Sequence, residues 1–279
     1  MTEPGLFAIL GLGLIGGSLA RDLAAQGATV WAFDVDEQAT RSAREAGVID
    51  RVIDSSLRAL REAETVVLAV PVDVAPSLLE RAVDHLDRAA LITDVGSTKR
   101  TIIQQASTLG VGDRFVGSHP LAGDHRSGWR ASRRGLFADA RVDLCRTLST
   151  RSEAWERAAE LWRAVGAAPA ERDATSHDVE LALSSHLPQL LALALAGTLA
   201  SRGIGRERLG RGGRDMTRLA ASSPGMWGGI FEDNAVPVLD ALDTCLAQLG
   251  ALRGAISCGD RRAMAEAFVA GHSWADAAN

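Results

Sequence analysis

The chain has 279 residues, 47% of them hydrophobic, so it can bury one large core or two moderate ones, and this composition excludes a disordered chain. Its 30 basic and 35 acidic residues give a formal net charge of −5, which excludes the overall basic field that attracts nucleic acid or an anionic membrane. Cys145, Cys245 and Cys258 lack disulfide or metal-ligand spacing, so we expect a cytoplasmic protein without a bound metal.

The first 172 residues alternate short apolar runs with amphipathic segments, which is typical of a parallel sheet with crossover helices. Segments 74–86 and 101–109 carry apolar residues at helical spacing. The predicted strands are Leu6–Leu10, Thr29–Phe33, Thr65–Val70, Leu91–Asp94 and Arg114–Ser118, with weaker ones near 142–147 and 168–172. We therefore predict a Rossmann-type, doubly wound α/β domain over residues 1–172, with ligands at the carboxyl ends of its strands.

A glycine-rich loop follows the first predicted strand and opens the first helix. It reads Gly11-Leu12-Gly13-Leu14-Ile15-Gly16, in the strand, loop and helix order of a dinucleotide-binding fold. In that fold Gly11 permits the tight turn, Gly13 lets a pyrophosphate approach the backbone, and Gly16 lets helix and strand pack closely. The anion would lie on the N–H groups at the helix start, which include those of Leu14 and Ile15.

An acidic residue follows at the distance expected for a ribose-binding group. Asp34 ends the second predicted strand, 18 positions after Gly16. A carboxylate there can accept hydrogen bonds from two ribose hydroxyls and would repel a 2′-phosphate. Arg41, the nearby cation, lies several residues into the next helix. The sequence therefore predicts NAD rather than NADP as the cofactor.

Three further strand ends carry the residues expected to face the cofactor and substrate. Val70 and Pro71 should form a rigid wall beside the nicotinamide, because Pro71 fixes its own backbone and restricts that of Val70. Ser97 follows the next predicted strand and His119 the one after it. Consecutive strand ends of a parallel sheet open on one crevice, so we expect Ser97 and His119 to lie in the same site.

The second half of the chain, residues 173–279, loses the strand pattern and becomes helical. Leu- and Ala-rich periodicities cover 175–202, 226–258 and 261–275. Residues 181–201 contain no Asp, Glu, Lys or Arg and reach the length of a membrane span, but their Ser, His, Pro and Gln residues favour a helix between protein surfaces. We predict an all-helical domain that forms a homodimer and does not enter a membrane, because its helices are apolar on more than one face.

Five sequence blocks, in order, resemble the signature blocks of the prephenate and arogenate dehydrogenase family. They are GLGLIGGS at 11–18, DVGS with a following lysine at 94–99, GSHPLAG at 117–123, SHLP at 185–188 and RDMTRLAASSPGMW at 214–227. Their order and separations are similar to those of the family, and the resemblance spans roughly residues 5 to 257.

The resemblance implies roles for four side chains. His119 matches the catalytic histidine, which takes the proton of the substrate's ring hydroxyl as hydride leaves the same carbon. Ser97 matches a serine that holds this hydroxyl and the histidine in register. His186 matches a second histidine that assists substrate binding, and Arg218 matches the arginine that binds a substrate carboxylate. Imidazole suits a general base because its unperturbed pKa lies near neutrality.

The residues around Arg218 fit a doubly anionic substrate. Arg211, Arg214 and Arg218 form a small cationic cluster, with the last two one helical turn apart. Arginine can hold a carboxylate through two parallel hydrogen bonds, so we take Arg218 as the main candidate and Arg214 as a lesser one. Asp215 could position Arg218 at i, i+3 spacing or form an ordinary surface pair.

Other positions depart from the family or stand apart from the expected site. After Gly123 many relatives have Thr or Pro followed by Glu, whereas this chain has Asp124, which could bind a substrate ammonium. Val142-Asp143-Leu144-Cys145 replaces a more uniformly apolar strand. His177 lies nine positions before His186, so on a regular helix the two rings would point to opposite faces, and we expect them in different sites.

The resemblance implies NAD-dependent oxidative decarboxylation of prephenate to 4-hydroxyphenylpyruvate in tyrosine biosynthesis. Arogenate, which would yield tyrosine directly, and an amino-substituted prephenate of secondary metabolism also fit these motifs. A β-hydroxyacid dehydrogenase would need a catalytic lysine in the helical domain, and no lysine follows Lys99. A non-catalytic dinucleotide sensor would not require the set formed by Ser97, His119, His186 and Arg218.

Overall fold

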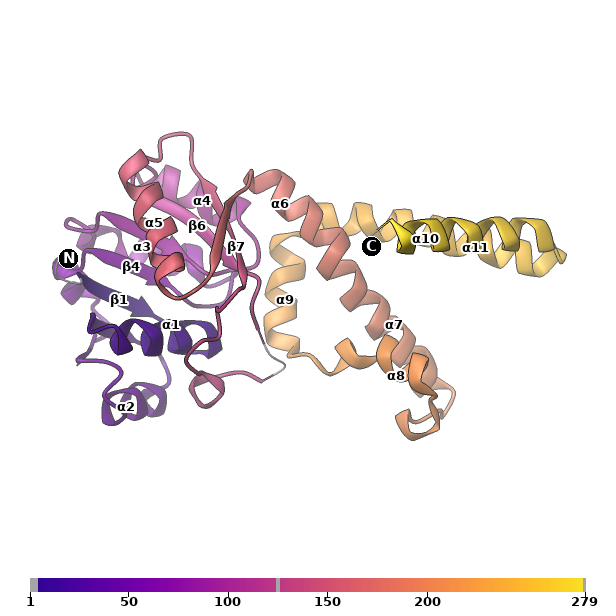
Figure 1. Ribbon diagram of the computed structural model, residues 1–279, viewed down its shortest axis with the longest axis horizontal. Helices are drawn as coiled ribbons and strands as arrows, with labels where there is room; N and C mark the ends of the chain where they lie inside the picture. The colour runs from indigo at the N-terminus through magenta and orange to yellow at the C-terminus, as the bar shows by residue number, and fades with distance from the viewer. Residues whose placement is uncertain (1–4, 124–125, 278–279) are drawn as a thin grey trace.

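The computed structural model describes residues 5–123 and 126–277, which form a Rossmann-type domain and a helical arm (Figure 1). The described residues of the first half form one eight-stranded sheet in the order β3-β2-β1-β4-β5-β6-β7-β8. Neighbouring strands are parallel except for β6 and β7, which run antiparallel. The strands are β1 (Leu6–Leu10), β2 (Thr29–Phe33), β3 (Arg51–Val52), β4 (Thr65–Leu68), β5 (Leu91–Asp94), β6 (Phe115–Pro120), β7 (Arg141–Arg146) and β8 (Ala168–Glu171).

The predicted fold class is confirmed, and the strand boundaries differ at three places. β4 ends at Leu68 rather than Val70, because its partner β5 ends at Asp94 in the same register. β3 has two residues, too few for a periodic signal. β6 continues to Pro120 because β7 pairs with it antiparallel as far as that residue, so His119 lies within a strand and opposite Asp143.

Helices cover both faces of the sheet and bury two separate cores. One core lies under α1 (Leu14–Ala25), α2 (Glu37–Glu45) and α5 (Ser152–Ala164), and the other under α3 (Ala75–Ala82) and α4 (Arg100–Thr108). Trp162 of α5 is fully buried, and its indole N–H donates to the Ser118 hydroxyl at 3.0 Å. The Ser118 hydroxyl lies 2.8 Å from that of Thr93, so buried polar groups also join β5, β6 and α5.

The helical arm begins with a helix whose middle turn is π-helical. α6 (Ala174–Leu181), the π-helical turn η4 (Ala182–His186) and α7 (Leu187–Ser201) run on continuously. Predicted helix 226–258 divides at Asn234 into two helices. The remaining elements are η5 (Arg206–Arg208), α8 (Arg211–Met216), η6 (Arg218–Ala221), α9 (Pro224–Asp233), α10 (Ala235–Cys258) and α11 (Arg261–Asp276).

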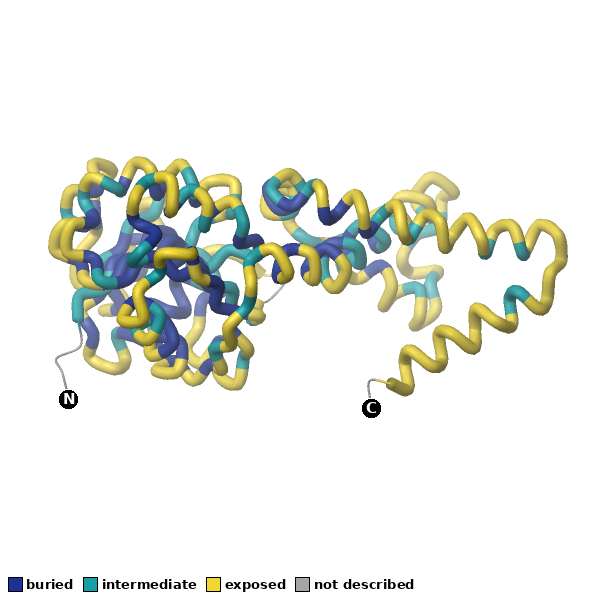
Figure 2. The backbone as a smooth tube through the Cα atoms, turned by 90° about the horizontal axis from the view of Figure 1, so that it is seen from above, coloured by how far each residue is buried: buried dark blue, intermediate teal, exposed yellow. Residues whose placement is uncertain are grey.

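The arm buries little of its own apolar surface. Its buried cluster contains only Ala182, Val238 and Ala241, with partly buried neighbours around them, in the part of the chain that the structure describes. α10 and α11 project away from the sheet as a hairpin that is almost entirely exposed (Figures 1 and 2). By length and composition alone, helices 174–201 and 235–258 could each cross a membrane. Their exposed apolar faces therefore lack a partner in the single chain.

The glycine loop joins β1 to α1 at a point where main chains approach closely. Gly11 has φ +106°, and a Cβ on it would lie 2.2 Å from the carbonyl oxygen of Ala69. A Cβ on Gly16 would lie 2.1 Å from the carbonyl oxygen of Gly11. In contrast, a Cβ on Gly13 would meet no atom within 4 Å. Gly11 and Gly16 thus serve the packing of the loop, whereas Gly13 leaves open space above it.

This contrast predicts opposite behaviour for two similar substitutions. Gly16→Ala forces its methyl group into main-chain atoms, so we expect unfolding free energy to fall by about 1–3 kcal/mol and Tm by several degrees. Gly13→Ala should leave Tm nearly unchanged but weaken binding of the expected dinucleotide at least ~10-fold, because the methyl group occupies the space that the pyrophosphate approaches. Thermal unfolding and calorimetric titration with NAD measure both effects. Equal Tm losses in the two variants would contradict this division of roles.

Candidate active site

A cavity of about 500 Å³ lies at the carboxyl ends of β1, β2 and β4. Gly11, Gly13, Asp34, Val70 and Pro71 all line it, as the sequence predicted for a cofactor site. One carboxylate oxygen of Asp34 lies 2.5 Å from the Leu12 nitrogen and the other 2.8 Å from the Asp36 nitrogen. These N–H groups orient the carboxylate, and each oxygen keeps a lone pair for a further donor such as a ribose hydroxyl.

The start of α1 offers unpaired donors beside this cavity. Gly13 is the N-cap, and it supplies no side-chain hydrogen bond. No acidic residue lies in the first turn, where Leu14 and Ile15 are half-buried. The N–H groups of a helix start without a capping acceptor favour an anion. Together with the open space at Gly13, the residues present fit the pyrophosphate and ribose of a dinucleotide.

The cofactor cavity is also lined by two large side chains that the sequence analysis did not single out. Trp129 and Arg81 both border it. The Trp129 ring also stacks under the Arg21 guanidinium, whose carbon lies 4.0 Å from the ring centroid. Arg81 donates to the carbonyl oxygen of Ser55 at 3.2 Å. Neither residue belongs to a recognisable motif, so only the fold brings them to the cavity.

His119 belongs to a chain of two histidines and one carboxylate that joins the two halves of the molecule. Its Nδ1 lies 2.9 Å from Nε2 of His177, and Nδ1 of His177 lies 2.9 Å from Oδ1 of Asp178. The two rings meet edge to face at an interplanar angle of 79°. His177 and Asp178 are buried in α6, while His119 is half-buried in β6. Among the residues that the structure describes, Nε2 of His119 is the ring nitrogen without a partner.

The expectation that His177 lies in a different site from His186 is therefore wrong. Both rings lie near enough to His119 to lower its pKa. The expectation assumed a regular helix, whereas the π-helical turn η4 lies between the two residues and changes the direction of the side chains that follow. A π-turn has no reliable sequence signal, although the Pro188 that follows it indicates an irregular helix.

His186 is held by neighbours from α9 and from the junction of α9 and α10. The Asn234 amide nitrogen lies 3.2 Å from Nδ1 of His186 and 2.8 Å from the main-chain oxygen of Asp178. The Trp227 ring packs edge to face against the imidazole at a centroid distance of 5.8 Å. His186 and Asn234 are fully buried. Like His119, His186 keeps Nε2 as the ring nitrogen without a protein partner in the described part of the chain.

Burial keeps both active-site imidazoles neutral. Burial lowers the pKa of His119 well below the usual 6.5, and the neighbouring His177 and Lys99 lower it further. Burial also lowers the pKa of His186 to about 4, although the Asp178 carboxylate acts in the opposite direction. At neutral pH, His119 is therefore an unprotonated base and His186 an uncharged ring.

A second cavity, of about 440 Å³, contains His119. Its wall includes the Leu121–Gly123 segment, Ser184 and Ser185 of η4, and two acidic residues, Asp143 and Glu180. Asp143 is buried, with Oδ1 2.6 Å from the Arg141 guanidinium and Oδ2 without a hydrogen-bond partner in the described part of the chain. An acidic side chain thus lies beside His119, opposite it in the β6–β7 pairing. This cavity and the cofactor cavity open at the carboxyl edge of the sheet, where substrate and cofactor are expected.

Ser97 and its neighbours lie at the end of β5. Ser97 is half-buried in a bend, and its hydroxyl makes no hydrogen bond to His119 or to any other described residue. Lys99 and Asp94 form a fully buried ion pair nearby, and Asp94 also accepts from the main-chain N–H groups of Gly96 and Ser118. The backbone around Ser97 is thereby fixed next to β6.

The arginine candidates lie apart from His119 in the single chain. Neither Arg214 nor Arg218 lines the cavity that holds His119. Arg214 donates to the main-chain oxygens of Leu209 and Glu207, which gives it a role in holding its own loop. Asp215 lies 3.9 Å from Arg211 and not beside Arg218, which is exposed without an ion pair among the described residues. Asp124 lies outside the described residues.

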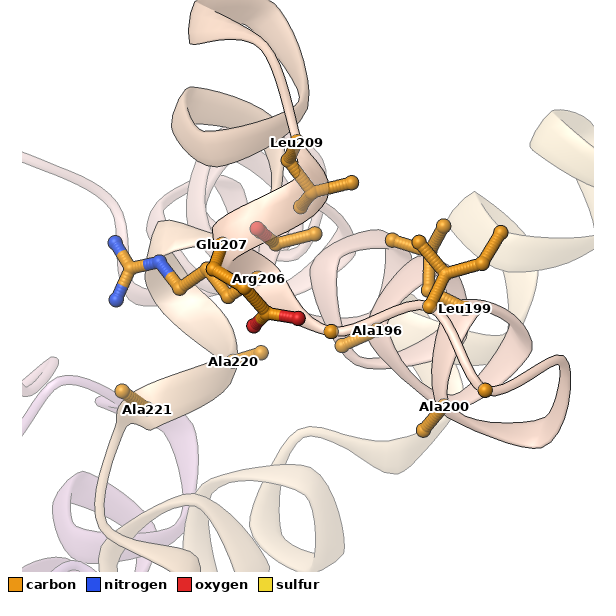
Figure 3. Close-up of a pocket in the computed structure, with 12 residues that line it drawn as sticks. Ala196, Leu199, Ala200, Arg206, Glu207, Leu209, Ala220 and Ala221 are labelled. Atoms are coloured by element: carbon orange, nitrogen blue, oxygen red, sulfur yellow. The ribbon is translucent and has the colours of Figure 1, made fainter.

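A third cavity, of about 640 Å³, lies beside the arginine segment, between the end of α7 and η6 (Figure 3). Its wall consists mainly of Ala, Leu and Gly residues, with Arg206 and Glu207 at one side. Thr217 and Ala220, which flank Arg218, border it. It contains none of the histidines and none of the sequence-predicted site residues, so it does not provide the chemistry of the active site.

Comparison with known proteins agrees with this geometry. Family models of the prephenate dehydrogenase nucleotide-binding domain and dimerization domain match residues 19–170 and 173–270. The chain is 35% identical to a prephenate dehydrogenase of Bacillus subtilis over 88% of this chain and 68% of that protein. It is also 35% identical to a cyclohexadienyl dehydrogenase of Zymomonas mobilis, over 96% of this chain and 94% of that protein.

A solved structure is similar over nearly the whole chain. The prephenate dehydrogenase of Aquifex aeolicus, in complex with hydroxyphenyl propionate and NAD+, superposes with a TM-score of 0.90 at 27% identity, covering 99% of this chain and 98% of that one. The two domain matches together cover most of residues 19–270, and the full-length relatives exceed 30% identity. The chain therefore belongs to the prephenate dehydrogenase family of oxidoreductases.

Proposed function

We propose that the chain catalyses NAD-dependent oxidative decarboxylation of prephenate to 4-hydroxyphenylpyruvate, as a cytoplasmic enzyme of tyrosine biosynthesis. The observation that carries this proposal is the neutral His119 imidazole on the wall of a cavity at the carboxyl edge of the sheet, held through Nδ1 and with no partner at Nε2 among the described residues. A general base without a charge fits a reaction that begins from a hydroxyl group and ends in an aromatic phenol. The names of the relatives support prephenate as the substrate.

The proposed reaction divides its tasks among a few groups. NAD, when bound, supplies the hydride acceptor. Nε2 of His119 accepts the hydrogen bond of the ring hydroxyl and takes its proton as hydride leaves the same carbon. Ser97 would hold the hydroxyl, His186 would contact the substrate, and Asp34 would bind the ribose. Loss of the ring carboxylate as CO2 makes the product aromatic, so position and charge suffice without a covalent intermediate.

Substrate carboxylates need cations, and we propose Arg218, with Arg214 as a lesser candidate, for this role. Support comes from the exposed, unpaired state of Arg218 among the described residues. Because Arg218 does not line the His119 cavity within one chain, its contribution requires a rearrangement of the arm or a second chain.

Replacing His119 tests the chemistry. His119→Asn should lower kcat by roughly 10²–10⁴-fold, because the base is lost, and leave NAD affinity within about twofold. Arg218→Ala, the companion variant, should mainly raise KM for prephenate.

The pH dependence of the wild type tests the protonation state of His119. Its kcat/KM should stay level through neutral pH and fall only below pH 6.5, because the depressed pKa keeps His119 unprotonated until then. Formation of reduced cofactor, followed by absorbance, measures all three. An active His119→Asn enzyme would rule out the proposed base.

A second candidate substrate carries an ammonium group, as arogenate does. Asp143 favours it, because the residue lines the His119 cavity and its buried Oδ2 has no hydrogen-bond partner among the residues that the structure describes. An ammonium would provide the missing donor, whereas the keto group of prephenate offers none. The cyclohexadienyl dehydrogenase among the relatives supports a substrate range broader than prephenate.

The ratio of kcat/KM for arogenate to kcat/KM for prephenate tests whether Asp143 binds a substrate ammonium. If the ammonium substrate is used through Asp143, Asp143→Asn should lower kcat/KM for arogenate at least ~10-fold relative to that for prephenate. His85→Asn, in the turn that follows α3 and outside the His119 cavity, provides a control that should leave the ratio unchanged. An unchanged ratio in Asp143→Asn would remove Asp143 from substrate selection and leave prephenate as the simpler assignment.

We also propose that two chains associate through the helical arm rather than insert into a membrane. Leu239, Leu246, Leu249 and Ile256 of α10 are each about half exposed or more, at 57%, 54%, 49% and 68%. Leu239, Leu242, Leu246 and Leu249 follow the alternating spacing of three and four residues that is typical of a helix-to-helix seam, and Ile256 lies one heptad beyond Leu249. The match of residues 173–270 to a dimerization domain supports a second copy as the partner.

Sedimentation equilibrium should give the mass of two chains for the wild type without detergent. Leu246→Asp places a charge in the seam and should give the mass of one chain. Leu148→Asp changes a fully exposed leucine of the Rossmann domain and should remain a dimer. A wild-type protein that sediments as a single chain, or that requires detergent to stay soluble, would refute the proposed association.

A further inference from the structure

The carboxylate of Asp178 accepts hydrogen bonds from several directions at once. Oδ1 lies 2.8 Å from the main-chain nitrogen of Lys99, and Oδ2 lies 3.0 Å from that of Arg100. Oδ1 also lies 2.9 Å from Nδ1 of His177. Main-chain nitrogens can only donate, so Asp178 acts as an acceptor on both oxygens. The hydrogen bond to His177 therefore requires a proton on Nδ1 of that ring.

This proton fixes the direction of the next hydrogen bond. A neutral imidazole that carries its proton on Nδ1 has a lone pair on Nε2. Nε2 of His177 then accepts, and Nδ1 of His119 at 2.9 Å donates. The remaining nitrogen of His119, Nε2, is left with a lone pair, which is the form that a base needs.

The main-chain oxygen of Asp178 fixes a second set of hydrogen bonds, which leads to His186. It accepts from the Asn234 amide nitrogen at 2.8 Å, which establishes that the nitrogen and not the oxygen of this amide faces Asp178. The second proton of that nitrogen points to Nδ1 of His186 at 3.2 Å. Nδ1 of His186 is then an acceptor, and a neutral ring must carry its proton on Nε2.

We propose that Asp178 is a positioning residue that sets opposite tautomers on two active-site histidines, leaving Nε2 of His119 as an acceptor and Nε2–H of His186 as a donor. Such a pair complements a hydroxyl group, which both donates and accepts. The other tautomer of His119, with its proton on Nε2, would present a second donor to the hydroxyl group and no base. The kinetic consequence rests on the proposed function, but the tautomers themselves do not.

The tautomers can be observed directly in the intact protein. Long-range ¹H–¹⁵N correlation spectra of the full chain, labelled with ¹⁵N-histidine, distinguish Nδ1–H from Nε2–H rings. Single His→Asn variants assign the signals of the six histidines. We expect Nδ1–H at His119 and at His177, and Nε2–H at His186. Nε2–H at His119, or Nδ1–H at His186, would overturn the proposal whether or not the enzyme turns over prephenate.

Asn234→Asp is a nearly isosteric change that should reverse the direction of the hydrogen bond to His186. An aspartate at this position can only accept, so the His186 ring should change to Nδ1–H while His119 keeps its tautomer. His85→Asn, in the turn that follows α3, where the ring is paired with Arg61, should change neither ring. Unchanged His186 signals in the Asn234→Asp protein would show that Asn234 does not control this ring.

Kinetics then separate positioning from mere structural support. His177→Phe removes the acceptor of the His119 proton, so kcat should fall at least ~10-fold with NAD affinity retained. The acid limb of the pH profile should also move to higher pH, because His177 is one of the groups that lower the pKa of His119. The other charged or titratable groups around His119 remain in place: Lys99, Arg141, Asp143, Asp178 and His186. A fall in kcat with an unmoved acid limb would contradict this role of His177.

Discussion

The carboxylate of Asp178 is the contact on which the arrangement of both halves depends. Helix α4 begins after Lys99, whose side chain pairs with Asp94 and does not cap the helix. Asp178, from α6 in the helical arm, supplies the missing acceptors to the N–H groups of Lys99 and Arg100. A helix cap contributes about 1 kcal/mol, and here it also fixes where the arm meets the Rossmann domain. Since the same carboxylate holds His177, the orientation of His119 is coupled to the docking of the two halves.

A second buried interaction supports the site from the other side. Burial raises the pKa of Asp94, while the Lys99 ammonium and the N–H groups of Gly96 and Ser118 act to lower it. A buried ion pair is weak evidence for stability, because removing two charges from water offsets much of their attraction. Its effect on chemistry is more direct, since the Lys99 charge lowers the pKa of His119. The pair thus joins β5 to β6 and helps to keep the base unprotonated.

The sequence predicted those features that depend on local patterns. The runs at Leu6–Leu10, Thr29–Phe33 and Leu91–Asp94 are strands with the predicted bounds, because β-branched and apolar side chains fill a sheet buried on both faces. The glycine loop and Asp34 meet at one cavity because strand order brings β1 beside β2. In contrast, His177 reaches His119 from α6 of the helical arm, and the antiparallel pairing of β7 places Asp143 opposite His119. Both depend on contacts between distant segments, for which a single sequence carries no periodic signal.

Arg218 shows why a sequence motif does not by itself place a side chain. The motif lies in the arm, whose helices bury only a small cluster around Ala182, Val238 and Ala241 within one chain. The positions of η6 and α8 relative to the sheet therefore depend on few internal contacts, whereas the His119 site rests on a buried network. A second chain packed on the apolar seam of α10 would add the contacts that the arm lacks. The geometry for proton transfer at His119 would then depend on one chain alone, whereas carboxylate binding by Arg218 would depend on the dimer. The two functions should therefore respond differently to the loss of the dimer.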